Sequence, residues 1–257
     1  MLITLTLLTS NAFADISADQ PTVLITGSNR GIGFEFVNKY SAMGWNVIAT
    51  ARKPAKATAL LELAKTRPNI IVEELDVTDY LRVDALADKY EDQPIDVLIN
   101  NAAITPKYIS AYRSVDGMDF DMARRSFEVN ALAPVKIARS FMPHIQASNQ
   151  KKLITISTKA ATFSESPKRA IMYSYRASKT ALNMFMYTLA FETADNGVIL
   201  TLLSPGLVNT MGLIGKVMPG SISTDESVTN MINVIDSLTI EDNGKMLNHA
   251  DRKVIAW

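Results

Sequence analysis

The sequence contains no cysteine and only two histidines, His144 and His249. Without cysteine, the chain forms neither a disulfide framework nor a thiolate metal site. The two histidines lie far apart in the sequence, and no acidic cluster has the spacing of metal ligands. We therefore expect no metal site, and we expect both histidines to be structural or surface residues. Chemistry in this protein must use hydroxyl groups, lysine and a bound cofactor.

The chain also lacks an excess of charge of either sign. It has 26 basic and 26 acidic residues and a formal net charge of zero. Nucleic-acid-binding surfaces are usually basic, so we expect no nucleic-acid partner. A chain of 257 residues is long enough for one large α/β domain with a well-buried core. The sequence shows no repeat, low-complexity tract or domain linker that would divide it.

The amino-terminal residues 1–14 form a short apolar run that ends in Ala12-Phe13-Ala14, a pattern resembling a cleavage site. The run is too short to span a bilayer as a helix, so we expect no stable membrane span. It lacks the basic start of a secretory signal. It is therefore either a signal peptide without its basic residues or a loosely packed extension. We treat residues 1–20 as an N-terminal extension and residues 21–257 as one domain. We expect a cytoplasmic protein, or a periplasmic or secreted one if residues 1–14 are cleaved.

From Pro21 onward, short β-branched runs alternate with segments whose apolar residues recur at helical spacing. Repeated strand–helix units of this kind give a parallel sheet with helices on both faces. The predicted strands are Thr22–Thr26, Trp45–Thr50, Ile70–Leu75, Ile95–Asn100, Leu153–Ser157, Val198–Leu203 and Lys245–Asn248. We therefore predict an α/β fold with a Rossmann-like, doubly wound, mostly parallel sheet of about seven strands.

The helical segments lie between these strands. The predicted helices are Ile32–Met43, Ala55–Thr66, Tyr80–Tyr90, Phe120–Ala147, Tyr173–Thr193 and Thr224–Leu238. Pro134 and Pro143 interrupt the fourth of them, and Thr224 is the predicted N-cap of the last. Residues 211–223 show no periodicity, and we expect them to form a loop over a site.

A glycine-rich segment, Thr26 to Gly33, connects the first predicted strand to the first predicted helix. Glycines keep such a turn tight and allow a pyrophosphate to approach the backbone, and the helix N-terminus supplies N–H donors. This position in the chain predicts a dinucleotide site. The spacing is TGxxxGxG instead of the commoner GxGxxG. The residues expected to contact the dinucleotide here are Gly27, Asn29, Arg30, Gly31, Ile32 and Gly33.

Tyr175 and Lys179 lie four residues apart in a predicted helix, which places both side chains on one face, one turn apart. A lysine ammonium near a phenol favours the phenolate, and we expect it to lower a tyrosine pKa that is ordinarily about 10. Such a tyrosine exchanges a proton near neutral pH, as the interconversion of a carbonyl and an alcohol requires. The same spacing also occurs on ordinary solvated helices, so the pair alone is weak support.

Together, the glycine spacing and the Tyr175–Lys179 pair resemble the short-chain dehydrogenase/reductase family, over nearly the whole length from Thr22 to Trp257. Further motifs follow in the family's order: Leu75-Asp76-Val77, Asn100-Asn101-Ala102-Ala103, Asn130 in FEVNALAP, Pro205-Gly206 and Thr210. YRASKTALNM and the C-terminal tail resemble the C-factor/Sniffer-like carbonyl reductase branch.

The resemblance assigns these motifs to a cofactor and to catalysis. It implies that the cofactor contacts Asp76, Val77, Asn100, Ala102, Tyr175, Lys179, Pro205, Gly206 and Thr210. Asp76 would lie against the adenine and Thr210 near the nicotinamide carboxamide. Lys179 would bind the nicotinamide ribose, and Asn130 would hold a water that connects Lys179 to solvent.

The expected catalytic serine is where the chain departs from the family pattern. The family usually reads Ile-Ser-Ser at the end of strand five, and here the segment is Ile156-Ser157-Thr158. We expect Thr158 to bond the substrate oxygen, because its hydroxyl still donates, although its methyl group narrows the pocket. Ser157 is the alternative, but alternation along a strand turns it to the opposite face.

The end of the second predicted strand indicates the cofactor. NAD enzymes usually carry an acidic residue there for the ribose 2′-hydroxyl. Here the residues are Thr50-Ala51-Arg52-Lys53, without a carboxylate, and Arg30 supplies a further cation. Arginine binds phosphate bidentately, so NADP(H) is favoured over NAD(H). The alternative is that Arg52 and Lys53 only solvate a loop.

The resemblance implies an NADPH-dependent oxidoreductase that transfers hydride between nicotinamide and a small carbonyl or alcohol substrate. Tyr175 would act as general acid/base, with Thr158, Lys179 and Asn130 as its catalytic partners. Members of the family often form homodimers or homotetramers. The candidate substrate walls are Tyr108, Tyr112, Phe163 and Met218. The alternatives are an NADP(H)-binding redox sensor or signalling protein with little turnover and, less consistent with the glycine spacing and short chain, an extended-type epimerase or dehydratase.

Overall fold

The protein is described by a computed structural model, which covers residues 16–105, 114–210 and 220–257. Its centre is a parallel seven-stranded sheet in the order β3-β2-β1-β4-β5-β6-β7. The strands are β1 (Thr22–Ile25), β2 (Asn46–Ala51), β3 (Ile70–Glu74), β4 (Val97–Asn100), β5 (Lys152–Ile156), β6 (Ile199–Ser204) and β7 (Met246–Asn248). The direction of strand addition reverses between β1 and β4, as in a doubly wound sheet, which confirms the predicted fold class.

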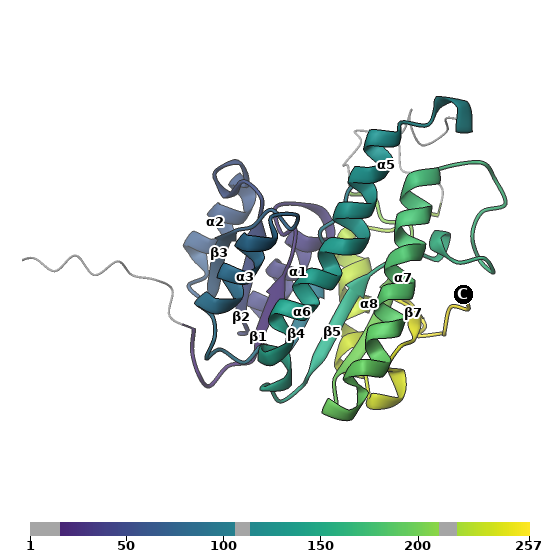
Figure 1. Ribbon diagram of the computed structural model, residues 1–257. Helices are drawn as coiled ribbons and strands as arrows, with labels where there is room; N and C mark the ends of the chain where they lie inside the picture. The colour runs from purple at the N-terminus through teal and green to yellow at the C-terminus, as the bar shows by residue number, and fades with distance from the viewer. Residues whose placement is uncertain (1–15, 106–113, 211–219) are drawn as a thin grey trace, which may run out of the picture.

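Helices cover both faces of the sheet (Figure 1). They are α1 (Gly31–Ala42), α2 (Thr58–Thr66), α3 (Tyr80–Lys89), α5 (Phe120–Phe127), α6 (Ala133–Gln146), α7 (Tyr173–Thr193) and α8 (Thr224–Asp236). Short 3₁₀ helices are η1 (Pro54–Lys56), η2 (Val115–Gly117), η4 (Lys159–Ala161), η5 (Ala194–Asn196) and η6 (Ile240–Asp242), and η3 (Glu128–Leu132) is a π-helix. The core contacts place α3, α6 and α7 on one face and α1, α2 and α8 on the other.

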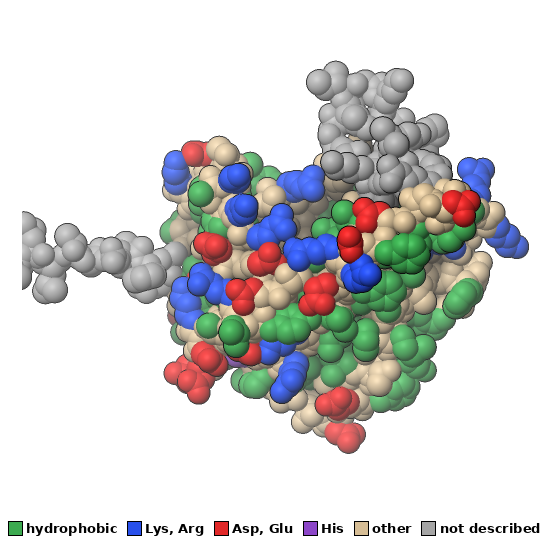
Figure 2. Space-filling view, turned by 45° about the horizontal axis from the view of Figure 1, so that its top comes forward, with side chains coloured by type: hydrophobic (Ala, Val, Ile, Leu, Met, Phe, Trp, Pro, Cys, Tyr) green, Lys and Arg blue, Asp and Glu red, His purple; other side chains and the backbone are tan. Residues whose placement is uncertain are grey.

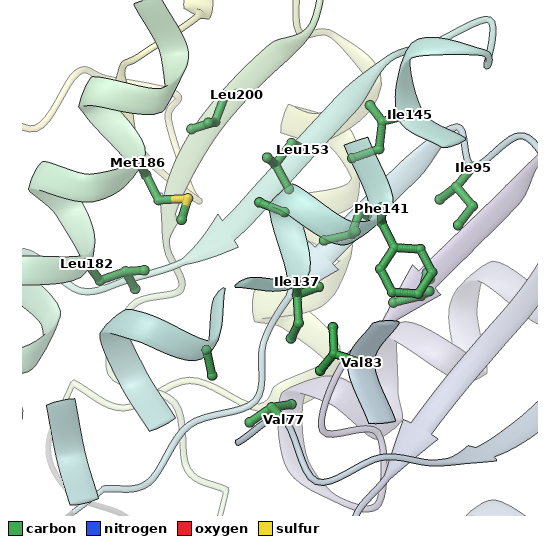
Figure 3. Packing of buried hydrophobic residues seen from close by; sticks show 14 of the residues in the cluster. Val77, Val83, Ile95, Ile137, Phe141, Ile145, Leu153, Leu182, Met186 and Leu200 are labelled. Atoms are coloured by element: carbon green, nitrogen blue, oxygen red, sulfur yellow. The ribbon is translucent and has the colours of Figure 1, made fainter. Parts of the chain in front are cut away.

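Two apolar layers hold the helices to the sheet. Along β1, Leu24 packs into the layer under α3, α6 and α7, whereas Val23 and Ile25 pack into the layer under α1, α2 and α8. Figure 3 shows the first layer, in which Phe141 of α6 and Leu182 of α7 lie over the sheet. Because both faces are covered, the central strands are mostly apolar runs without a polar face, whereas the edge strand β3 ends in Glu73 and Glu74.

The predicted elements agree with the observed ones to within a few residues at their ends, with two differences. The predicted helix over Phe120–Ala147 is not broken by its prolines, because α5, η3 and α6 follow one another directly. Pro134 lies in the first turn of α6, where a missing N–H is tolerated, and Pro143 lies inside that helix. The N-cap of α8 is Ser223 and not Thr224: Ser223 has extended backbone, and its hydroxyl accepts from the Glu226 N–H at 3.0 Å.

The described part of the amino-terminal extension contacts the domain. The Asn46 side chain accepts from the Ser17 N–H at 3.1 Å and donates to the Ser17 carbonyl at 2.8 Å. Ile16 packs against the core. The predicted cleavage site lies outside the described residues. No helix within residues 16–105, 114–210 and 220–257 is long and apolar enough to cross a membrane.

Candidate active site

Most of the predicted site residues follow the carboxyl ends of strands β1 to β6, and the others lie in η3 and α7. Because these strands are parallel, their carboxyl ends lie at one edge of the sheet, beside the point where strand order reverses. The glycine-rich loop follows β1, and helix α1 begins within it at Gly31. This edge is where a doubly wound sheet binds its ligand.

The glycines of the loop are required by close contacts. A Cβ atom on Gly27 would lie 2.8 Å from the Cα of Ala102, and one on Gly33 would overlap the carbonyl oxygen of Gly27. Gly27 and Gly31 have φ angles of +70° and +59°, which side chains rarely adopt. A Cβ on Gly31 would be 3.4 Å from Thr210. The structure thus brings together four predicted cofactor residues around one narrow turn, together with Thr210 from the loop after β6.

Asn101 locks this turn in place, although we did not predict it as a site residue. Its side-chain nitrogen donates to the carbonyl oxygens of Thr26, at 2.8 Å, and Gly27, at 3.2 Å. The Thr26 hydroxyl accepts from the N–H groups of Asn101 and Ala102, each at 3.0 Å. By contrast, the buried Asn100 side chain donates to the Pro134 carbonyl at 3.2 Å. The Oδ1 atom of Asn100 is buried and has no hydrogen-bond partner among the described residues.

The N-terminus of α1 has the features of a phosphate site. Arg30 occupies the N-cap position without a side-chain cap bond, and the first turn contains no acidic residue. Among the described residues, the first N–H groups of α1 have no side-chain acceptor, and the helix dipole favours an anion there. Asn29 and Arg30 are exposed beside this end, as is Arg52 after β2. Among the residues described, neither arginine forms a salt bridge.

Asp76 lies next to this cationic region. Its Oδ1 accepts from the Thr78 hydroxyl at 2.8 Å, and its Oδ2 lies 3.9 Å from the guanidinium of Arg125. Burial acts to raise the pKa of Asp76, but the Thr78 bonds and the charges of Arg125 and Arg52 outweigh it, so the pKa lies below its usual value. Arg125 carried no sequence signal, because only the fold brings α5 to the end of β3. Val77 is buried in the core, so its side chain packs instead of facing a ligand.

Tyr175 and Lys179 both lie on α7, as predicted, but the electrostatics differ from the expectation. Lys179 is buried, and its Nζ donates to the carbonyl of Ile156 at 2.8 Å. Burial lowers the pKa of Lys179 to about 8 and raises the pKa of Tyr175 to about 12. The predicted lowering of the tyrosine pKa is therefore wrong for this structure, because desolvation dominates. Tyr175 is protonated at neutral pH and has a proton to give.

Asn130 is buried in the π-helix η3, and its amide group is already engaged. Its Oδ1 accepts from the Ile104 N–H at 2.8 Å, and its Nδ2 donates to the Ile104 carbonyl at 3.0 Å and to the Ser178 hydroxyl at 3.1 Å. Asn130 thus ties the segment after β4 to α7, next to Lys179. The water relay stays a prediction. Because the side-chain amide is engaged, the backbone of η3 would have to hold the water. π-helical turns often occur at functional sites.

The structure separates Ser157 from Thr158. Ser157 is buried, and its hydroxyl donates to Oδ1 of Asn183 at 2.5 Å, which holds α7 to the end of β5. Thr158 is half-buried, and its Oγ1 accepts from the Ala160 N–H at 3.2 Å. The Thr158 hydroxyl donates to none of the described residues, so its hydrogen has no partner among them.

Arg176 holds the connection between β5 and α7, although we did not predict a role for it. Its guanidinium donates to the Ala160 carbonyl at 3.0 Å, the Arg169 carbonyl at 3.0 Å and the Ser166 hydroxyl at 2.9 Å. These bonds join three points of one connection to the residue that follows Tyr175. The sequence does not predict this role, because every residue has a backbone carbonyl and no residue pattern identifies the ones that accept these bonds.

A cavity of about 120 Å³ lies beside Tyr175, between the starts of α5 and α7. Its walls are formed by Ile104, Thr105, Ser114, Gly117, Met118, Asp119, Met122, Ser126, Met172, Tyr173, Ser174 and Tyr175. Phe163, a predicted wall, does not line it and is 89% exposed. The other predicted walls, Tyr108, Tyr112 and Met218, lie outside the described residues.

The loop after β6 packs against a histidine. The Pro205 carbonyl accepts from the Ser227 hydroxyl at 2.7 Å. Gly206 has a φ angle of +82°, and a Cβ there would lie 2.6 Å from Cε1 of His249. His249 is half-buried against this loop, as expected for a structural residue. In the described parts of the chain no group of three or more His, Cys, Asp or Glu residues could hold a metal ion.

The chain matches the family model described as short chain dehydrogenase over residues 21–219. A short chain dehydrogenase of Penicillium aethiopicum is 31% identical over 256 residues, covering 92% of this chain and 99% of its own length. An uncharacterized oxidoreductase of Schizosaccharomyces pombe is 29% identical over 243 residues, covering 88% of this chain and 93% of its own length.

Solved structures agree with this family. The NADPH-bound carbonyl reductase from chicken fatty liver is similar with a TM-score of 0.84 and 30% identity, covering 93% of this chain and 94% of that one. The carbonyl reductase Sniffer of Drosophila melanogaster has a TM-score of 0.82 and 26% identity, covering 93% and 100%. The chain therefore belongs to the short-chain dehydrogenase family of oxidoreductases, in its carbonyl reductase-like branch.

Proposed function

We propose that the protein is an NADP(H)-dependent oxidoreductase that interconverts a small carbonyl compound and its alcohol. The observation that carries this proposal is the position of Tyr175: it lines a cavity at the ligand-binding edge of the sheet, one helical turn from the buried Lys179. The chicken carbonyl reductase, which is similar over most of the chain, is NADPH-bound.

The residues at the glycine-rich loop fit a dinucleotide phosphate. Gly27 and Gly33 allow a tight turn that side chains would prevent, and the start of α1 offers N–H groups that no described side chain caps. Arg30 and Arg52 are exposed beside it, and neither forms a salt bridge with a described residue. Two such guanidinium groups suit a 2′-phosphate better than a ribose hydroxyl. When bound, the nicotinamide would supply or accept the hydride.

In the direction of reduction, the chain's own residues would hold the carbonyl and deliver the proton. The Thr158 hydroxyl donates to the carbonyl oxygen, and Tyr175 gives its phenolic proton to the same oxygen. Tyr175 carries its proton at neutral pH, and its raised pKa means that the phenolate formed on donation needs stabilisation. Lys179 is held below it by the Ile156 carbonyl, and a positive charge there would stabilise the phenolate that forms.

The test is NADPH oxidation, followed at 340 nm, with a panel of aldehydes, quinones and diketones, for the wild type and Tyr175→Phe. We expect turnover of at least one compound, reduced by about 10²-fold or more in the variant. Tight NADPH binding without turnover across the panel would favour a redox sensor. Failure to bind either NADPH or NADH would contradict the proposal as a whole.

We also propose that a second copy of the chain covers α5 and α7. Figure 2 shows hydrophobic side chains gathered at the right of that view, the side on which Figure 1 places these helices. Exposed apolar residues on them include Phe120, Met122, Phe127, Met184, Phe185 and Phe191. Sedimentation velocity should show a homodimer or homotetramer, and Phe191→Glu should shift it toward monomer. A monomeric wild type would refute this assignment.

For the chain's organisation, we propose one cofactor-binding domain over residues 21–257, preceded by an extension over residues 1–20. We place the protein in the cytoplasm, where NADPH is available. Fractionation of the producing cells, together with N-terminal sequencing of the purified protein, tests both points. A mature chain that begins after Ala14 would contradict the cytoplasmic location.

A further inference from the structure

Met172, just before α7, has an unusual backbone conformation. Its φ and ψ angles are 55° and 40°, in the left-handed region. Among the residues described, only Lys151, Met172 and Arg252 are non-glycine residues with positive φ. L side chains rarely adopt this conformation, and when they do, the surrounding structure must enforce it, often at a functional site.

Contacts on both sides enforce the conformation of Met172. On its amino side, the Ile171 N–H donates to the Arg169 carbonyl at 3.0 Å, and the Arg176 guanidinium donates to that same carbonyl. On its carboxyl side, the Met172 carbonyl accepts from the Arg176 N–H at 2.9 Å as the first bond of α7. The backbone is thus held by hydrogen bonds on both sides of Met172. The change of backbone direction between the loop and α7 occurs at this residue.

The position of the residue suggests why a methionine occupies it. Met172 lines the cavity that Tyr175 also lines, together with Met118 and Met122. The only charged wall residue among those described, Asp119, is already used as the N-cap of α5, where it accepts from the Met122 N–H at 2.9 Å. A glycine would adopt the backbone of Met172 without strain but would remove this part of the wall.

We propose that Met172 determines substrate size: its left-handed backbone sets its side chain in the wall of the cavity, where it limits the apolar group that a substrate carries next to its carbonyl. The inference rests on the proposed function, because it assumes that the carbonyl is reduced at Tyr175. The cavity of about 120 Å³ is slightly smaller than the engineered cavity of about 150 Å³ that takes up benzene. A group about the size of a single unsubstituted ring is therefore expected to fit beside Met172.

The test compares benzaldehyde with 4-tert-butylbenzaldehyde for the wild type, Met172→Gly and Met172→Asn. Glycine and asparagine both accept the left-handed backbone, and both shorten the side chain. We expect the ratio of kcat/KM for the bulky aldehyde to that for the small one to rise at least about tenfold in both variants. Met172→Leu, which keeps the bulk, should leave the ratio close to that of the wild type.

Lys151→Gly is the matched control, because Lys151 has nearly the same φ angle, 52°, and lies at the opposite end of β5. Lys151→Gly should not change the ratio of kcat/KM for the two aldehydes. Both Lys151→Gly and Met172→Gly should keep Tm within about 2 °C of the wild type. An unchanged ratio in folded Met172→Gly and Met172→Asn would overturn the inference while leaving the reductase intact. A wild type without Tyr175-dependent turnover of either aldehyde would overturn the inference together with the proposed function.

Discussion

Replacing Lys179 with methionine should separate stability from activity. Lys179 is 3% exposed, and burial lowers the pKa of its amine from 10.5 to about 8. Such a shift means that the charged form of the amine is less stable in the folded protein than in the unfolded chain. Lys179→Met keeps the length of the side chain and removes the charge, so it should stabilise the fold at neutral pH while it abolishes activity.

The shift of the pKa gives the size of this effect. The difference between 10.5 and about 8 corresponds to about 3 kcal/mol of unfavourable burial at neutral pH. Losing the hydrogen bond to the Ile156 carbonyl reduces this stabilisation by about 1–2 kcal/mol. The net gain in the free energy of unfolding is therefore about 1–2 kcal/mol at pH 7.

The sign of the pH dependence follows from the two protonation states. Below pH 8 the amine is charged in both the folded and the unfolded chain, and the full penalty applies. Above pH 8 the folded protein releases a proton that the unfolded chain keeps up to about pH 10.5, so the stability of the wild type increases with pH. The advantage of Lys179→Met should therefore shrink by about 2 kcal/mol between pH 8 and pH 9.5. Tyr175 is common to both proteins, so its own titration cancels in the comparison.

Urea unfolding at several pH values, followed by circular dichroism, measures this difference directly. Lys159→Met is the control, because Lys159 is an exposed lysine close to the end of β5. Its free energy of unfolding should stay close to that of the wild type, because the side chain is solvated. A constant difference between Lys179→Met and the wild type from pH 6 to pH 9.5 would show that burial does not depress the lysine pKa.

Three further substitutions test the cofactor and substrate contacts. Gly33→Ala should weaken NADPH binding at least about tenfold in a fluorescence titration, because the new methyl group would overlap the carbonyl of Gly27 and open the loop. Arg52→Asp should weaken NADPH binding about tenfold and leave NADH binding nearly unchanged, and equal losses for both would contradict the assignment of the 2′-phosphate. Thr158→Val should lower kcat about 10²-fold while Thr158→Ser retains activity; full activity of the valine variant would exclude the hydroxyl from catalysis.

The sheet and most of the helices could be predicted from the sequence because both depend on local patterns. Apolar runs such as Thr22–Ile25 are long enough for strands, and the helical period of Tyr173–Thr193 is sustained. The cap of α8 was misplaced by one residue because both Ser223 and Thr224 are suitable N-caps. Only the backbone conformation, extended at Ser223, decides between them.

The site could be predicted only as a set of motifs, because its geometry depends on contacts between distant segments. Asn101 and Arg176 hold the glycine-rich turn and the loop before α7 through bonds to backbone carbonyls. A carbonyl is present at every position, so no residue pattern marks it as a partner. Arg125 approaches Asp76 only because α5 packs beside the end of β3.

The pKa of Tyr175 shows why spacing alone does not determine electrostatics. The spacing of Tyr175 and Lys179 correctly places them one turn apart, but the sign of a pKa shift depends on which effect is larger. Burial raises the pKa of the tyrosine and lowers the pKa of the lysine, so each group is pushed toward its neutral form. A neutral tyrosine has a proton to give, which suits the reduction of a carbonyl. In the reverse direction Tyr175 must first lose that proton, which becomes easier as the pH rises, so oxidation of the alcohol should be favoured only at higher pH.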